Sequence, residues 1–158
     1  MLNKAAQMKS FLKNCIMTWN FSDRYYYLKA ILENAAKIFS VAVGGAFGAV
    51  ARYFINISPL ANLFEKFPFP TFFINVTGSF LVGFFLILLT DKVRVDVNVR
   101  MAIIVGFLGA FTTFSTFEAE ISGLMKEAQY LLALAYLIFS ISVGFIGLSA
   151  GIRLAETF

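Results

Sequence analysis

The stretch that decides the fold is Gly106-Phe-Leu-Gly-Ala-Phe-Thr-Thr-Phe-Ser-Thr-Phe117. It lies in an apolar segment long enough to span a membrane, yet residues 112–116 carry four hydroxyl side chains in five positions. Polar groups in hydrocarbon need partners, and irregular backbone at membrane depth survives only inside protein or along a cavity. The cluster therefore predicts a helix that breaks near Gly109–Thr113 and frees backbone carbonyls. The alternative is an ordinary membrane helix whose hydroxyls bond back to their own carbonyls.

The composition around this stretch is that of an integral membrane protein. Of 158 residues, 59% are hydrophobic and only 14% are charged, whereas soluble domains are about 25% charged. The length suits one domain. A net charge of +4 without a basic stripe favours contact with anionic lipid over nucleic acid. The chain has no histidine and a single cysteine, Cys15, which excludes an internal disulfide and most metal sites.

Four apolar segments predict an all-α fold with four transmembrane helices. The first three run from about 38 to 57, from 71 to 90, and from Met101 through the quoted stretch to Glu118 and Glu120, where we expect the chain to meet water. The last runs from about 128 to 152. The second segment is free of charge and has about the 20 residues that a bilayer requires.

Residues 1–36 differ from the rest and form a predicted extension, separate from a four-helix transmembrane domain at 37–158. The extension mixes lysines and arginines with apolar residues and lacks a long uncharged core, which argues against a secretory signal peptide. A basic amphipathic arm on the membrane surface is one interpretation, with Tyr25–Tyr27 as an interfacial cluster. The other is a partly disordered extension upstream of a later start, at Met8 or Met17.

Glycines spaced by four occur in the first and last segments, as Gly44-x-x-x-Gly48 and Gly147-x-x-x-Gly151. This spacing allows membrane helices to approach closely. Four short spans do not easily enclose a pore alone, so the glycines suggest self-association, most simply as a two-fold dimer. Packing within one subunit is the alternative.

The polar side chains of the spans are neutral. Without Asp, Glu or His in the span interiors, a proton-driven transporter is disfavoured, and the absence of a nucleophile–base pair argues against an enzyme. What remains is the Asn75 amide, the hydroxyls and the positive edges of aromatic rings, with Phe114 and Phe117 on one helix face. Such donors suit a small anion that must also be able to leave. Asn75 could instead join helices, and Arg52 could either snorkel or attract anions to an entrance.

Three motifs carry a resemblance to a known family. The segments 44–53, 73–80 and 106–118, read as GGAFGAVARY, FINVTGSF and GFLGAFTTFSTFE, closely resemble the CrcB/Fluc fluoride channels. The match runs from about residue 38 to the end of the chain. It implies a passive fluoride-selective channel of the bacterial inner membrane that exports cytoplasmic fluoride and lowers its toxicity. It also implies an antiparallel dual-topology homodimer in lipid, with two pathways along the dimer interface.

The resemblance further implies roles for individual residues. Phe114 and Phe117 are the expected pore phenylalanines, and Asn75 is the expected pore amide. A structural sodium ion is expected on the backbone carbonyls of Gly109 and Thr112 from each subunit. The remaining pathway hydroxyls implied by the family are Ser115 and Thr116, and, less firmly anchored, Ser140 and Ser142.

The runner-up function is a small multidrug-resistance-like exporter. That chemistry requires a membrane-embedded Glu in the first span, and residues 38–57 contain none.

The charges flanking the spans bear on the orientation that the resemblance implies. From Lys37 onward, five Lys and Arg flank one side of the spans and three flank the other, and the extension raises the ratio to ten against three. Because such a bias sets orientation, we expect either a start near Met17 or an arm too distant to govern insertion.

Overall fold

The structure, a computed structural model, describes residues 7–8, 21–64 and 66–158. Half of the predicted extension at 1–36, including Lys4, Lys9, Lys13 and Met17, lies outside the described residues. The chain divides into two compact units, Met1–Ala36 and Lys37–Phe158. In the first unit, Lys29 and Glu33 are one helical turn apart with 4.0 Å between their charged atoms.

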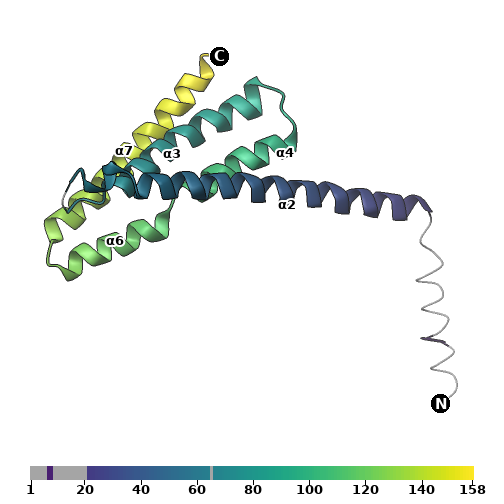
Figure 1. The fold of residues 1–158 in the computed structure, drawn as a ribbon. Helices are drawn as coiled ribbons and strands as arrows, with labels where there is room; N and C mark the ends of the chain where they lie inside the picture. Colours follow the sequence, from purple (N-terminus) through teal and green to yellow (C-terminus); the bar gives the residue numbers. More distant parts are fainter. Residues whose placement is uncertain (1–6, 9–20, 65) are drawn as a thin grey trace. The chain divides into compact units, whose positions relative to one another are not determined.

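Four helical segments of the described chain are long and apolar enough to cross a membrane (Figure 1). They are Arg24–Asn56, Phe69–Lys92, Val97–Lys126 and Tyr130–Glu156. No strand occurs in the described residues. The predicted all-α membrane architecture with four spans is therefore confirmed.

The second and fourth spans pack along each other with their backbones in contact. Helix α3 (Phe69–Ile87) begins with Pro70 in its first turn and continues into a π-helical turn, η2 (Leu88–Lys92). Helix α7 (Tyr130–Glu156) lies against it. A Cβ atom at Gly83 would lie 2.3 Å from the carbonyl oxygen of Leu148, and one at Gly151 would lie 2.1 Å from that of Phe80. Only glycine allows this approach.

The first span uses its glycines in the same way. Helix α2 (Phe21–Asn56) passes the π-helical segment η3 (Met101–Leu108). Cβ atoms at Gly44 and Gly48 would lie 2.0 and 2.1 Å from the carbonyl oxygens of Ala102 and Phe107. In the last span, a Cβ atom at Gly147 would lie 3.2 Å from the carbonyl oxygen of Val76. Both glycine pairs therefore serve packing within one chain, which is the alternative interpretation, and they carry no argument for self-association.

The third span is the irregular one. It consists of α4 (Val97–Arg100), η3, α5 (Gly109–Phe111) and α6 (Phe114–Lys126). Between α5 and α6 the helix breaks at Thr112 and Thr113, which are extended, with φ/ψ of −74°/156° and −150°/118°. The predicted break is confirmed, but Gly109 itself is helical at −64°/−34°. Two β-branched threonines, which favour extended backbone, end the helix instead of the glycine.

After the first span, the chain turns through a short helix, η1 (Pro59–Asn62), before α3. Ser58 caps this turn, since its hydroxyl accepts from the Leu60 amide at 3.3 Å. Prolines at 68 and 70 then fix the entry into α3. This connection brings Phe67 beside Tyr136 of α7, and Phe72 in the first turn of α3 packs against the same cluster of buried residues.

Candidate functional site

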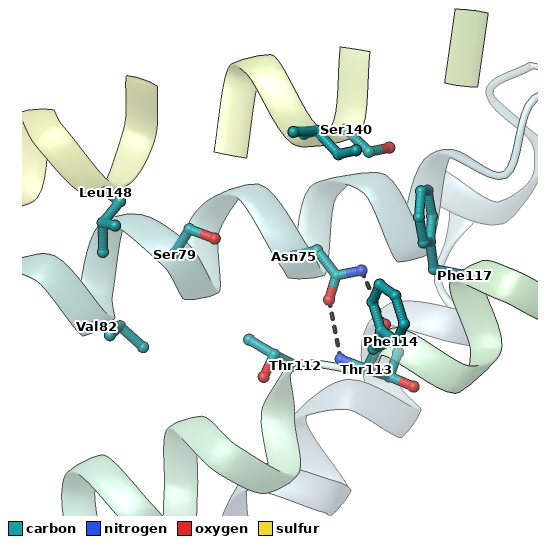
Figure 2. A pocket seen from close by; sticks show the side chains of 10 residues that line it. Asn75, Ser79, Val82, Thr112, Thr113, Phe114, Phe117, Ser140 and Leu148 are labelled. Atoms are coloured by element: carbon teal, nitrogen blue, oxygen red, sulfur yellow. Dashed lines mark hydrogen bonds between the residues drawn. The ribbon is translucent and has the colours of Figure 1, made fainter. Parts of the chain in front are cut away.

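A pocket of about 320 Å³ opens beside the helix break, where α3, α6 and α7 meet (Figure 2). No charged side chain is among its lining residues. The pocket thus gathers side chains from three spans around the irregular backbone of residues 112 and 113. Its lining consists of Asn75, Ser79, Val82, Thr112, Thr113, Phe114, Phe117, Ser140, Ile141 and Leu148.

The side chain of Asn75, on α3, is bonded to both backbone groups of Thr113 at the helix break (Figure 2). The Thr113 N–H donates to Asn75 Oδ1 at 2.9 Å, and Asn75 Nδ2 donates to the Thr113 carbonyl at 3.0 Å. Because Nδ2 carries two hydrogens, one N–H remains for a ligand in the pocket. Asn75 does join two spans, as its alternative interpretation held, and it lines the pocket as well.

The threonines of the break satisfy their hydroxyls locally. Thr112 Oγ1 donates to the Leu108 carbonyl at 3.0 Å, which is the back-bonded arrangement. Thr113 Oγ1 donates to Thr116 Oγ1 at 2.8 Å and accepts from the Thr116 amide at 3.3 Å. Thr113 thereby caps the N-terminus of α6. Thr116 and Ser115 are exposed and do not line the pocket, so their place in a pathway stays a prediction.

Phe114 and Phe117 project from the first turn of α6, and both line the pocket. Their ring centroids are 6.0 Å apart. Phe117 is 5% exposed and its ring meets that of Tyr136 in an edge contact, with centroids 4.9 Å apart. Phe114 is 71% exposed in the single chain. The two rings lie on one face of α6, as the spacing of three predicted, and the role of their edges stays a prediction.

A carboxylate network lies behind Phe117, where the sequence predicted contact with water. Glu120 is half-buried: Thr71 Oγ1 donates to its Oε1 and the Tyr136 hydroxyl to its Oε2, both at 2.7 Å. Both carboxylate oxygens are thus satisfied, as a buried charge requires. The network fixes Tyr136, which is fully buried and packs on Phe117. Sequence reasoning missed it because the partners lie 49 and 16 residues away.

The last span contributes Ser140, whose buried hydroxyl has no hydrogen-bond partner among the described residues. An unsatisfied buried hydroxyl costs about 1–3 kcal/mol, so a ligand in the pocket that Ser140 lines would remove this penalty. Ser142 is exposed, and Arg52 is half-buried on α2; neither lines the pocket. Of the predicted site residues, the structure brings together Asn75, Phe114, Phe117 and Ser140 with Thr112 of the break.

Comparison with known proteins adds an independent finding. The family described as "CrcB-like protein, Camphor Resistance (CrcB)" matches residues 39–152. A protein of Hydrogenobaculum named "Fluoride-specific ion channel FluC" is 41% identical over 112 residues, covering 71% of this chain and 91% of that protein. Proteins of the same name from Hahella chejuensis and Chlorobium chlorochromatii are 44% and 39% identical, covering 73% and 77% of this chain and 91% and 94% of theirs. The chain therefore belongs to the CrcB family.

Proposed function

We propose that this chain is a passive fluoride channel of the bacterial membrane. The observation that carries the proposal is the uncharged pocket, which is lined by Asn75, by two phenylalanines and by Ser140, whose hydroxyl has no partner among the described residues. The relatives named as fluoride-specific ion channels support the same ion. A small, strongly hydrated anion needs several donors in place of its water. Without a fixed cation in the lining, binding stays weak enough for the ion to leave.

The physiological sense of such a channel follows from acid chemistry. Hydrogen fluoride crosses a bilayer as a neutral molecule and dissociates in the less acidic cytoplasm, where the charged anion is trapped. A passive pathway lets the anion leave down its electrochemical gradient. Export by this route needs no energy source and no proton-carrying residue.

Fluoride efflux from liposomes tests the function. Purified protein reconstituted into liposomes loaded with potassium fluoride should release fluoride on addition of a potassium ionophore, and should release no comparable amount of chloride from matched liposomes. The measurement uses a fluoride-selective electrode. Chloride flux of similar size would contradict the proposal.

A proton-coupled exporter is the rival function, and the carboxylate of Glu120 is the observation that bears on it. Glu120 is a half-buried acid near the end of the third candidate span. Both of its oxygens are already occupied by Thr71 and Tyr136, which favours a structural role. If fluoride left the liposomes only under an imposed proton gradient, the exporter would replace the channel.

The arrangement of subunits is a finer part of the proposal: an antiparallel homodimer. Phe114 lines the pocket yet is 71% exposed in the single chain, and Ile141 beside it is 61% exposed. A second copy of the chain would cover Phe114 and Ile141 and would form the missing side of the pocket. The nearly balanced flanking charges from Lys37 onward, five against three, are compatible with insertion in both directions. A C-terminal reporter active on one side of the membrane only would exclude dual topology.

A structural sodium ion at the helix break belongs to the same proposal. The backbone there fits a hard cation. In a continuous helix the Thr113 amide would donate to the Gly109 carbonyl, but here it donates to Asn75. The Gly109 carbonyl therefore lacks its helical donor. Gly109 is exposed, and the space that a Cβ would occupy there is open. Carbonyl oxygens suit such an ion without any charged side chain, and the ion would supply a fixed charge that joins the carbonyls of Gly109 and Thr112 from two copies.

Replacement of sodium tests this site. We expect the detergent-solubilised protein to lose dimer and to unfold at a lower temperature when sodium is exchanged for N-methylglucamine. A bound cation stabilises by mass action, by about 2.7 kcal/mol at a concentration of 100 Kd. Size-exclusion chromatography with light scattering and a thermal melt would measure both effects. An unchanged dimer fraction and melting temperature would count against the ion.

A further inference from the structure

We infer that Asn75 is a positioning residue that holds the third span in its broken conformation, in addition to any contact with the ion. Its side-chain amide forms a two-point clamp on Thr113, with bonds of 2.9 and 3.0 Å (Figure 2). In a continuous helix the Thr113 N–H would bond to the carbonyl of Gly109, four residues earlier. The clamp supplies the replacement from another span, 38 residues away in sequence.

The hydrogen-bond requirement of the membrane makes this replacement necessary. Residues 112 and 113 are extended, and a backbone N–H or carbonyl without a partner at membrane depth costs several kcal/mol. Thr113 is 9% exposed, so water is a poor substitute. A side chain that both donates and accepts is required, because the clamp meets one N–H and one carbonyl. Asn is the shortest side chain that carries the donor and the acceptor on two separate atoms.

The clamp also fixes which way the amide faces. The Thr113 N–H can only donate and its carbonyl can only accept, so Oδ1 and Nδ2 of Asn75 cannot exchange places without losing both bonds. The remaining Nδ2 hydrogen is therefore held in one direction. One residue thus joins two features of the site: the open helix break and a preoriented donor in the pocket.

Close packing on the neighbouring turn keeps the clamp in reach. Gly78, one turn after Asn75 on α3, is buried, and a Cβ atom there would lie 2.3 Å from Thr112 Cγ2. Without a side chain at this position, α3 approaches the break closely enough for Asn75 to bond to Thr113. The break is thus held by hydrogen bonds at Thr113 and by close packing at Thr112.

Loss of fluoride flux in Asn75→Ala cannot by itself test the inference, because an ion contact and a clamp would both reduce it. A backbone signal at Thr113 can. The sequence contains a single Thr-Thr pair, Thr112–Thr113. In the full chain labelled with 13C-carbonyl and 15N threonine, a TROSY-HNCO spectrum therefore shows one cross-peak, which joins the Thr112 carbonyl to the Thr113 amide.

We expect Asn75→Ala to move this cross-peak in both dimensions. The Thr113 amide should shift because it loses its acceptor, and the Thr112 carbonyl should shift because the backbone turns toward helix. Asn75→Asp keeps an acceptor for the Thr113 amide, and a charged one forms a shorter bond, so its amide proton should move downfield. Ser79→Ala, which changes another polar lining residue one turn away on α3, should leave the peak in place. An unmoved peak in Asn75→Ala would overturn the inference, and an upfield shift in Asn75→Asp would do so if the alanine variant does not fold.

The inference deepens the proposed function, and the two can fail separately. Fluoride efflux from the same preparation reports on conduction, while the cross-peak reports on the break whether or not the protein conducts. A wild-type protein that shows the expected shifts but no fluoride flux would leave the clamp in place and remove the channel. Fluoride flux in the wild type together with an unmoved cross-peak in Asn75→Ala would support the channel and remove the clamp.

Discussion

Phe117→Ile is expected to lower fluoride flux at least about tenfold, since a loss of about 1.4 kcal/mol at the barrier already has that effect. Isoleucine keeps apolar bulk but has no positive ring edge to face an anion. The Phe117 ring lines the pocket and is held by its edge contact with Tyr136 at 4.9 Å. Phe114→Ile should reduce flux by the same reasoning, because its ring lines the same pocket at 6.0 Å from Phe117.

Stability distinguishes this effect from damage to the fold. Phe117 is 5% exposed and Phe114 is 71% exposed in the single chain, so only Phe117→Ile should lower the melting temperature of the subunit clearly. Aromatic pairs contribute about 0.5–1.5 kcal/mol beyond their buried area. Phe67→Ile is the matched control: its ring also meets Tyr136 edge-on, at 5.2 Å, but lies outside the pocket. We expect Phe67→Ile to lose stability and keep its flux. If Phe117→Ile and Phe67→Ile conduct equally in the efflux assay, Phe117 is an ordinary packing residue.

The elements of the fold that sequence could predict are those with a local cause. Hydropathy and span length located four helices, because a bilayer imposes both on each segment separately. The break in the third span was also foreseen, since four hydroxyls in five positions conflict with lipid. The break lies at Thr112 and Thr113, inside the predicted range of Gly109–Thr113 but not at the glycine itself. Glycine permits a break, but here the extended threonines and the Asn75 clamp make it.

The partners across the structure are what the sequence could not supply. Glu120 was expected at the water boundary, but Thr71 and Tyr136 from two other spans take both of its oxygens. Similarly, the spacing of Gly44 and Gly48 predicted a close approach without identifying which helix approaches. Such pairings depend on how the spans are arranged around one another. No periodicity within one segment records that arrangement.

Gly151→Ala is expected to destabilise the fold strongly. Its Cβ would lie 2.1 Å from the Phe80 carbonyl oxygen and 2.9 Å from the Phe84 nitrogen. Both are backbone atoms of α3, so relief requires the two helices to separate. Overpacking of this kind costs typically about 1–3 kcal/mol, occasionally more, and rigid backbone on both sides places this site at the upper end. We expect little monodisperse protein after extraction, and a melting temperature well below that of the wild type.

Gly123→Ala is the control, because the same substitution should change the melting temperature in the opposite direction there. Gly123 lies inside α6, where a Cβ atom would have nothing within 4 Å. There the intrinsic preference of alanine for helix, about 1 kcal/mol over glycine, should raise the melting temperature. The same chemical change is thus expected to destabilise at one site and stabilise at the other, because only at Gly151 do two backbones meet. Fluorescence-detected size-exclusion chromatography after stepwise heating would compare them. Equal melting temperatures for the two variants would mean that α3 and α7 do not approach as closely at Gly151 as the structure places them.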